Sequence, residues 1–174
     1  MLFFLAFSVA SYAQQRNAPT IQWLKFEEAV AKNVQQPKKI FLDLYTDWCS
    51  WCKVMDRNTF SDAKVAAYMS KYFYAVKFDA EGKTPITFME NTFQYNAQYR
   101  AHELAVAFLQ GQMSYPSTAY MDGSNQLLTV VPGYMGPDDF LPILVYFGGD
   151  HYLKMNWEDF QKEWPDIEKV LTVN

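Results

Sequence analysis

The sequence predicts an α/β fold in which a central mixed sheet is flanked by helices on both faces. Two short apolar runs, residues 39–46 and 74–80, are typical of strands buried on both sides of a sheet. Two further strands within residues 117–133 flank Asp122-Gly123, a dipeptide that favours a hairpin turn. Parallel crossovers combined with one hairpin require a mixed sheet.

Helical patterns lie between and after these strands. They are expected at residues 23–34, 52–60, 61–73, 96–111, 138–147 and 156–164. Gly82, Pro85 and Asn91 predict a loop over residues 81–95, and Pro142 interrupts one of the helical patterns without ending it.

The composition fits one globular domain, expected to span residues 14–174. The chain has 174 residues, of which 50% are hydrophobic and 20% charged. The formal net charge is -4, and lysine and arginine are not gathered into a run, so nucleic acid is not an expected partner.

Residues 1–13, MLFFLAFSVASYA, are expected to be a cleaved signal peptide. An apolar run is followed by Ser11-Tyr12-Ala13, which has small residues at both positions that a signal peptidase recognises. The run is too short to span a bilayer. It lacks the usual positive start, since no lysine or arginine precedes Arg16, and a buried N-terminal strand or helix is the alternative. The sequence thus predicts an exported protein, periplasmic or otherwise extracytoplasmic.

Cys49 and Cys52 are the only cysteines, and they lie in the stretch DWCSWCK. A disulfide staple across so short a loop removes little entropy from the unfolded chain and stabilises it weakly. A structural zinc site needs four ligands, but there is no second cysteine pair, and His102 and His151 are far apart in sequence. We interpret His102 as a packed or surface residue and His151 as part of a polar turn. The pattern therefore favours a redox centre over a staple or a metal site.

A strand that runs directly into a helix places Cys49 at or near the N-terminus of that helix. The unpaired N–H groups and the helix dipole there favour the thiolate. Cys52 follows one turn later on the same face. This arrangement predicts an exposed nucleophile with a more protected resolving thiol, as thiol–disulfide exchange requires.

Asp43 interrupts an otherwise apolar strand six residues before Cys49. A buried carboxylate is costly unless it has a partner or a chemical role. We expect Asp43 to lie beneath the cysteine pair, to exchange a proton with Cys52 through a water, and to pair with Lys77 of the next strand. The alternative is that Asp43 faces solvent at the end of its strand.

Pro116 stands just ahead of a strand, where a cis peptide bond is compatible with a tight turn. Such a loop beside Cys49 exposes the backbone of Tyr115 for pairing with an extended substrate strand. An ordinary trans turn is the alternative.

Together these segments resemble the thioredoxin superfamily. The resemblance is carried by FLDLYTDWCSWCK, AVKFDAE, YPSTAYMD and VVPGY, in the family's order, over about residues 22–147. The stretch TDWCSWCKVMDRNTFSDAKVAAYMSKYF is similar to exported thioredoxin-like proteins of periplasmic thiol reduction and cytochrome c maturation. The resemblance implies a thioredoxin-like fold with an inserted helix in residues 81–114 and a C-terminal helical extension, residues 148–174.

The resemblance also implies roles for individual residues. Cys49 corresponds to the attacking cysteine and Cys52 to the resolving one. The remaining correspondences are Trp48 to the flanking tryptophan, Asp43 to the buried acid, Lys77 to its lysine neighbour and Pro116 to the cis-proline. The expected catalytic residues are Cys49, Cys52, Asp43 and Lys77, and the expected substrate-binding residues are Trp48, Trp51, Tyr115 and Pro116.

Three departures separate this chain from typical thioredoxins. Ser50-Trp51 replaces Gly-Pro, which bears on the redox potential, and Tyr115 replaces a small aliphatic residue, which narrows substrate access. The third is the longer stretch 81–114.

The resemblance implies an exported thiol–disulfide oxidoreductase, and Asp43 with Lys77 favours a disulfide reductase. Such an enzyme is expected to need no cofactor beyond a redox-active Cys49–Cys52 disulfide, and no metal. The expected partners are protein or peptide disulfides and a membrane thiol relay that donates electrons. The alternatives are a disulfide oxidant or isomerase, and a non-catalytic peptide-binding or chaperone-like module.

Overall fold

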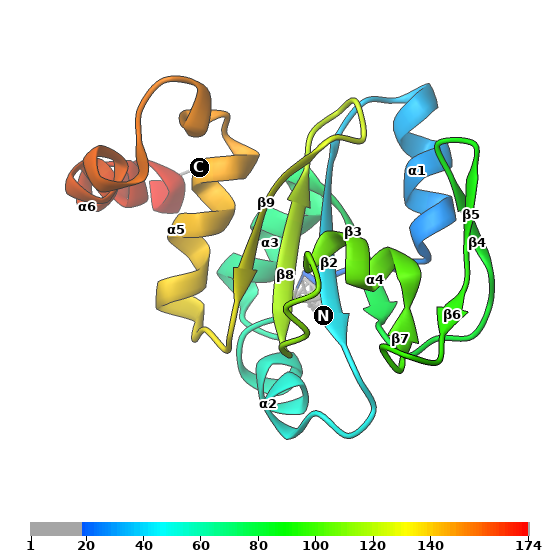
Figure 1. Ribbon diagram of the computed structural model, residues 1–174. Coiled ribbons are helices and arrows are strands. Elements are labelled where there is room, and N and C mark those ends of the chain that lie inside the picture. The colour runs from blue at the N-terminus through cyan, green and yellow to red at the C-terminus, as the bar shows by residue number, and fades with distance from the viewer. Residues whose placement is uncertain (1–18, 174) are drawn as a thin grey trace, which may run out of the picture.

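The computed structural model describes residues 19–173, so the expected signal peptide, residues 1–13, lies outside the described residues. A five-stranded sheet runs through the centre in the order β1-β3-β2-β8-β9 (Figure 1). β1 and β2 are parallel to β3, whereas β8 is antiparallel to both β2 and β9. The strands are β1 (Trp23–Leu24), β2 (Lys39–Tyr45), β3 (Phe73–Asp79), β8 (Ser117–Met121) and β9 (Leu127–Pro132). The predicted mixed sheet is confirmed.

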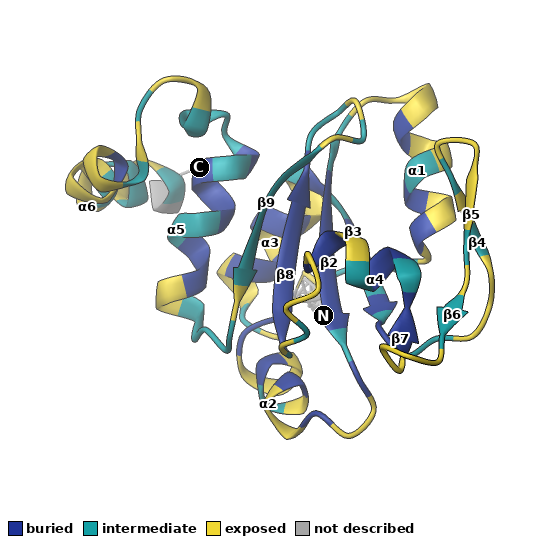
Figure 2. Cartoon of the chain, in the orientation of Figure 1, coloured by how far each residue is buried: buried dark blue, intermediate teal, exposed yellow. Residues whose placement is uncertain are grey.

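Helices cover both faces because the central strands are apolar on both sides (Figure 2). In β2, Ile40, Leu42 and Leu44 pack toward α1 (Phe26–Gln35) and α4 (Glu103–Phe108). Phe41 points the other way, into the core shared with α3 (Ala63–Tyr72) and α5 (Pro137–Gly148). Asp43 is two positions from Phe41 and therefore lies on that second face.

The helix that carries the cysteine motif begins where β2 ends. α2 (Ser50–Asn58) lies at the edge of the sheet where β8 starts and β9 finishes (Figure 1). Three loops from distant parts of the sequence thus meet at this edge.

The first predicted helix, residues 23–34, is partly wrong. Trp23 and Leu24 form β1, which pairs with Ala75 and Val76 at the free edge of β3. α1 starts only after Lys25, whose backbone N–H donates to the Glu28 carboxylate. Pairing with the sheet edge here outweighs the helical spacing of the apolar residues.

The insertion between β3 and β8 contains more strand and less helix than predicted. β4 (Ile86–Phe88) and β5 (Asn91–Phe93) form a hairpin within the expected loop, 81–95. The first half of the helix expected at residues 96–111 is instead β6 (Tyr95–Asn96), a turn and β7 (Ala101–His102). The inserted helix is reduced to α4, because the His102 backbone N–H is held by the Ala80 carbonyl and its ring caps α4.

The chain after the sheet is helical, and it is longer than the short helix predicted at 156–164. α5 is followed by the 3₁₀ turn η1 (His151–Leu153) and by α6 (Trp157–Val173), which continues through Pro165. α6 lies beside α5, away from α1 (Figure 1). Its Phe160 is fully buried. Among the helices of residues 19–173, none combines the length and hydrophobicity that crossing a membrane requires.

Candidate active site

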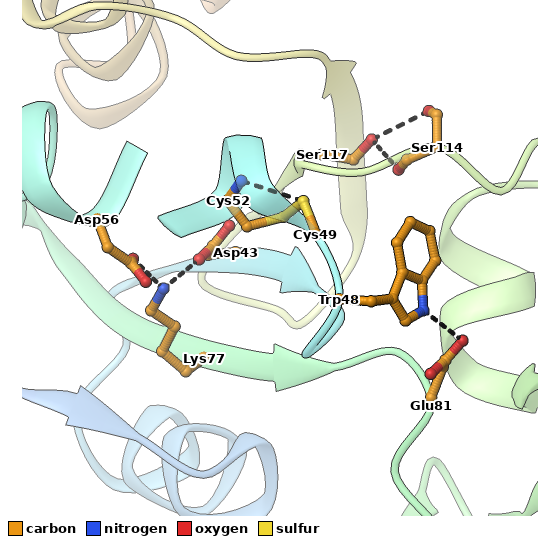
Figure 3. The surroundings of a disulfide bond; sticks show 9 residues. All are labelled: Asp43, Trp48, Cys49, Cys52, Asp56, Lys77, Glu81, Ser114 and Ser117. Carbon is orange, nitrogen blue, oxygen red and sulfur yellow. Dashed lines mark hydrogen bonds and ion pairs between the residues drawn. A yellow bond between two sulfur atoms is a disulfide. The ribbon is translucent and has the colours of Figure 1, made fainter. Parts of the chain in front are cut away.

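Cys49 and Cys52 form a disulfide at the start of α2, with 5.3 Å between their Cα atoms (Figure 3). Cys49 is the N-cap of the helix, as predicted, and its sulfur accepts a hydrogen bond of 3.0 Å from the Cys52 backbone N–H. This position places the sulfur among the unpaired N–H groups of the first turn, which stabilise a thiolate.

The predicted difference in exposure between the two cysteines is absent from this disulfide form. Cys49 is 4% exposed and Cys52 is 3% exposed. The Cys49 sulfur is bonded to Cys52 and turned toward the helix backbone, which removes it from solvent. The exposed groups are instead the rings of Trp48 and Trp51 on either side.

Asp43 and Lys77 meet as predicted. They are direct neighbours across β2 and β3, and Lys77 Nζ lies 2.6 Å from Asp43 Oδ2. The Asp43 side chain is 1% exposed, so the solvent-facing alternative is wrong. Its second oxygen, Oδ1, is buried without a hydrogen-bond partner in the described part of the chain. In Figure 3 the carboxylate points from β2 toward the cysteine turn of α2.

Burial controls the charge of this pair. Loss of solvation raises the pKa of Asp43 to about 6, although the charge and hydrogen bond of Lys77 oppose that rise. Burial also acts to lower the pKa of Lys77, but the carboxylates of Asp43 and Asp56 outweigh it and raise that pKa. Lys77 is therefore a cation, while Asp43 changes its charge close to neutral pH.

The other groups around Lys77 were not predicted from the sequence. Asp56 forms a second ion pair with Lys77 (Figure 3). Asp56 follows Cys52 by four positions, a helical spacing that could have identified it. Three aromatic rings also surround the ammonium group, with centroids 5.0–5.2 Å from Nζ: Trp23, Tyr45 and Phe60.

Pro116 follows a cis peptide bond, the conformation that the sequence left open. Its carbonyl accepts a hydrogen bond of 2.8 Å from the Gly133 N–H, which joins the start of β8 to the end of β9. Gly133 has a φ of +97°, a conformation that glycine adopts without strain.

Aromatic contacts fix both tryptophans beside the disulfide. Trp48 Nε1–H donates to Glu81 Oε1 at 3.0 Å, and its ring meets Tyr115 edge-on with centroids 5.9 Å apart. Burial, reinforced by nearby carboxylates, raises the pKa of the Tyr115 hydroxyl to about 12. On the other side, the centroid of Trp51 lies 5.1 Å from that of Tyr134.

The two histidines lie outside this site. His102 is buried: its Nδ1 accepts from Leu104 N–H, and its Nε2 lies 3.2 Å from the Thr84 carbonyl oxygen. His151 belongs to η1, on the opposite side of the fold from α4. Within residues 19–173, no three histidine, cysteine or acidic side chains are grouped as a metal site.

A family model matches most of the chain. The model is Thioredox_DsbH, described as "Protein of unknown function, DUF255", and it covers residues 4–139. Among curated proteins, the thiol:disulfide interchange protein DsbD of Pectobacterium atrosepticum is 39% identical over 54 residues, which are 31% of this chain and 9% of that protein. The chain thus spans about a tenth of the length of that relative.

Solved structures agree with this match. A structure named DsbH Oxidoreductase superposes with a TM-score of 0.56 at 18% identity, over 82% of this chain and 95% of the other. A putative disulphide-isomerase from Bacteroides thetaiotaomicron superposes with a TM-score of 0.54 at 22% identity, over 76% of this chain and 96% of the other. The fold is therefore thioredoxin-like. The chain belongs to the Thioredox_DsbH family and carries the CxxC pair on which thioredoxin-like disulfide oxidoreductases rely in place of a cofactor.

Proposed function

We propose that this protein is an exported thiol–disulfide oxidoreductase that works as a reductase of protein or peptide disulfides. The observation that carries the proposal is the disulfide at the start of α2, with the Asp43–Lys77 pair on the adjoining strands. A disulfide with a purely structural role between residues three positions apart needs neither a buried ion pair beside it nor a flanking cis-proline loop.

In the proposed reaction the reduced protein begins as a dithiol. The Cys49 thiolate attacks one sulfur of the substrate disulfide, and the other substrate sulfur leaves as a thiolate that takes up a proton. Cys52 then loses its proton, attacks the Cys49 sulfur and releases the second substrate thiolate. Two electrons pass to the substrate, and the Cys49–Cys52 disulfide is the oxidised product.

Asp43 is the proposed acceptor of the Cys52 proton. Its pKa of about 6 leaves it mostly ionised at neutral pH, and Oδ1 has no competing partner in the described residues. A base of that pKa is well matched to proton transfer near neutral pH. Deprotonating Cys52 speeds the release of reduced substrate, which favours the reductase direction.

The proposed cycle needs a source of electrons outside the cytosol. Disulfides persist there, so the Cys49–Cys52 disulfide must be reduced again by a dithiol donor. The similarity to DsbD, a thiol:disulfide interchange protein, supports a membrane thiol relay as that donor. The export signal at residues 1–13, a periplasmic location and a part in cytochrome c biogenesis belong to this proposal.

A trapping experiment tests the proposal. The Cys52→Ser variant is expected to accumulate a mixed disulfide between Cys49 and a protein substrate, because the resolving thiol is absent. The adduct is visible on a non-reducing gel and disappears with dithiothreitol. Cys49→Ser is the matched control and is expected to trap nothing. If Cys52→Ser traps no adduct and the wild-type protein does not reduce insulin, the proposed function is ruled out.

The reduction potential decides the direction of electron flow. We expect a value near that of thioredoxin, about -270 mV, from equilibration with glutathione. A value near about -120 mV identifies an oxidant instead. Ser50 and Trp51 stand between the cysteines where typical thioredoxins have Gly-Pro, and this difference bears on the potential.

A further inference from the structure

A pocket opens beside the disulfide, on the side of Trp51. It has a volume of about 290 Å³ and is lined by Trp51, Tyr115, Pro116, Gly133 and Tyr134. Three of these five residues are aromatic, and none carries a charge at neutral pH. The pocket therefore presents flat apolar surfaces to whatever approaches the disulfide.

The walls of the pocket come from three separate segments that hold one another. Trp51 lies in the first turn of α2, and its ring contacts that of Tyr134, just after β9. Tyr115, before β8, also lines the pocket, and Trp48 contacts its ring edge-on. Gly133 lines it as well, and an added Cβ there would meet nothing within 4 Å, so the absence of a side chain leaves this space open.

The backbone beside the pocket is able to take an extended peptide. Within the described residues, neither the N–H nor the carbonyl of Tyr115 forms a hydrogen bond, although Pro116 next to it is bonded to Gly133. A substrate strand that pairs with Tyr115 places alternate side chains on opposite sides. One side chain next to the substrate cysteine then points at the pocket.

Trp51 is a large apolar residue that is 58% exposed, and covering its ring would be favourable because apolar surface would leave water. Large aromatic residues at such positions are common anchors of binding surfaces. A planar side chain in this pocket can pack against the aromatic rings of the lining residues, whereas a charged one finds no partner among them.

We propose that this pocket makes the protein select disulfides whose cysteine is flanked by an aromatic residue, with Tyr134 and Trp51 as the specificity-determining side chains. This inference rests on the proposed function, since it concerns the substrates of the same cysteine pair. It adds the class of substrate: an extended, locally apolar peptide segment with an aromatic neighbour to its cysteine.

Peptide disulfides that differ at one position test the inference. Homodimers of a short peptide carry phenylalanine or alanine, placed once before and once after the cysteine, and are mixed with the reduced full-length protein. Each turnover yields the oxidised protein and two peptide thiols, which chromatography separates. At one of the two positions, we expect the phenylalanine dimer to react at least about tenfold faster than the alanine dimer.

Variants then assign the preference to the pocket. Tyr134→Ala is expected to reduce the phenylalanine-to-alanine rate ratio to about twofold or less, while Tyr134→Phe, which keeps the ring, retains it. Tyr99→Ala removes another exposed tyrosine that does not line the pocket and is expected to leave the ratio unchanged. Using a ratio cancels any general effect of a substitution on cysteine reactivity.

Hydroxyethyl disulfide, which has no side chain to place, separates the two proposals. If the wild-type protein reduces it but treats the phenylalanine and alanine dimers alike, the inference is wrong and the function stands. A preference that survives Tyr134→Ala also overturns the inference. If the protein reduces none of these disulfides, the proposed function fails and the inference falls with it.

Discussion

Lys77 Nζ lies 2.6 Å from Asp43 Oδ2 and forms a second ion pair with Asp56, so one lysine connects β2, β3 and α2 directly behind the disulfide. Asp43 is almost fully buried, whereas the Asp56 side chain is 43% exposed. Lys77 therefore stabilises a carboxylate that burial alone would neutralise. The balance between those two effects sets the pH behaviour of the site.

We predict that Asp43→Asn increases the stability of the oxidised protein above pH 6. The pKa of Asp43 rises from 3.8 to about 6 on folding, so the folded state binds more protons than the unfolded state between these values. The contribution of Asp43 is fully present below about pH 4 and is lost as the pH rises through 6. At about 1.36 kcal/mol per pH unit, the loss is about 3 kcal/mol.

Urea unfolding of the oxidised wild-type and Asp43→Asn proteins between pH 4 and 8 measures this effect. The lowered pKa of buried His102 gives a dependence of opposite sign, lost as the pH falls, but it is common to both proteins and cancels in the difference. Asp138→Asn, which removes an exposed carboxylate at the start of α5, is the matched control. A difference that does not change with pH would contradict the prediction.

We predict that Lys77→Met destabilises the protein by about 3 kcal/mol at pH 8 and by less at pH 5. At pH 8 Asp43 is ionised in the wild-type protein, and the substitution leaves it buried without its partner, so it must either stay charged or take up a proton from solvent at pH 8. Breaking buried pairs in this way costs about 3–5 kcal/mol. The lower end applies because the Lys77 side chain is 22% exposed. At pH 5 Asp43 is protonated and needs its partner less.

The double variant Asp43→Leu with Lys77→Met provides the control. It removes the buried carboxylate together with its partner, so we expect it to recover most of the stability lost in Lys77→Met. Asp56 stays behind in both proteins, but water can solvate it. The single variant Asp43→Leu completes the comparison. If its loss and that of Lys77→Met add up to the loss in the double variant, the pair is not coupled.

We predict that the resolving step becomes faster as the pH rises through about 6 and that Asp43→Asn removes this dependence. The ionised carboxylate accepts the proton of Cys52, and a positioned base of this kind accelerates proton transfer by about 10²–10⁴-fold. Single-turnover reduction of insulin, followed from pH 5 to 8, measures the profile. An Asp43→Asn profile that coincides with that of the wild type would exclude Asp43 as the proton acceptor.

The sequence was sufficient to predict the Asp43–Lys77 pair because each residue is the one charge in the interior of an apolar strand, the other charges, Lys39 and Asp79, being at strand ends. Charges inside two adjacent buried strands need each other. The sequence did not predict the position of Trp23. The spacing of the apolar residues that follow it fits a helix, whereas its backbone pairs with β3. The contact between Trp23 and Lys77 was missed for that reason. Trp23 of β1 and Phe60, just after α2, both approach Lys77 because these two segments pack on the same face of the sheet.

The structure of the insertion between β3 and β8 was harder to predict from the sequence, because its short strands pair with each other rather than with the main sheet. Residues 96–111 have a helical composition, but His102 is held at Ala80 and Thr84 and caps α4, which delays the helix to Glu103. Such contacts span more than fifteen residues and are invisible to local periodicity. Glu81, which fixes Trp48 at the site, was missed for the same reason.

The C-terminal extension packs against α5 through the ring of Phe160. Phe160 of α6 is fully buried, and its ring contacts Tyr146 of α5 and Trp157 of α6 with centroids 5.0 and 5.6 Å apart. We expect Phe160→Ala to lower the free energy of unfolding by about 3–5 kcal/mol, because it removes buried apolar surface and leaves a cavity.

Leu153→Ala is the matched control, since this leucine lies in the same extension but is 70% exposed and is expected to change the stability by less than about 0.5 kcal/mol. Urea unfolding at pH 7 measures both variants. If Phe160→Ala were as stable as Leu153→Ala, α6 would not be part of the core. The expected loss instead makes the extension a structural support of α5, and through α5 of the sheet face that carries Asp43.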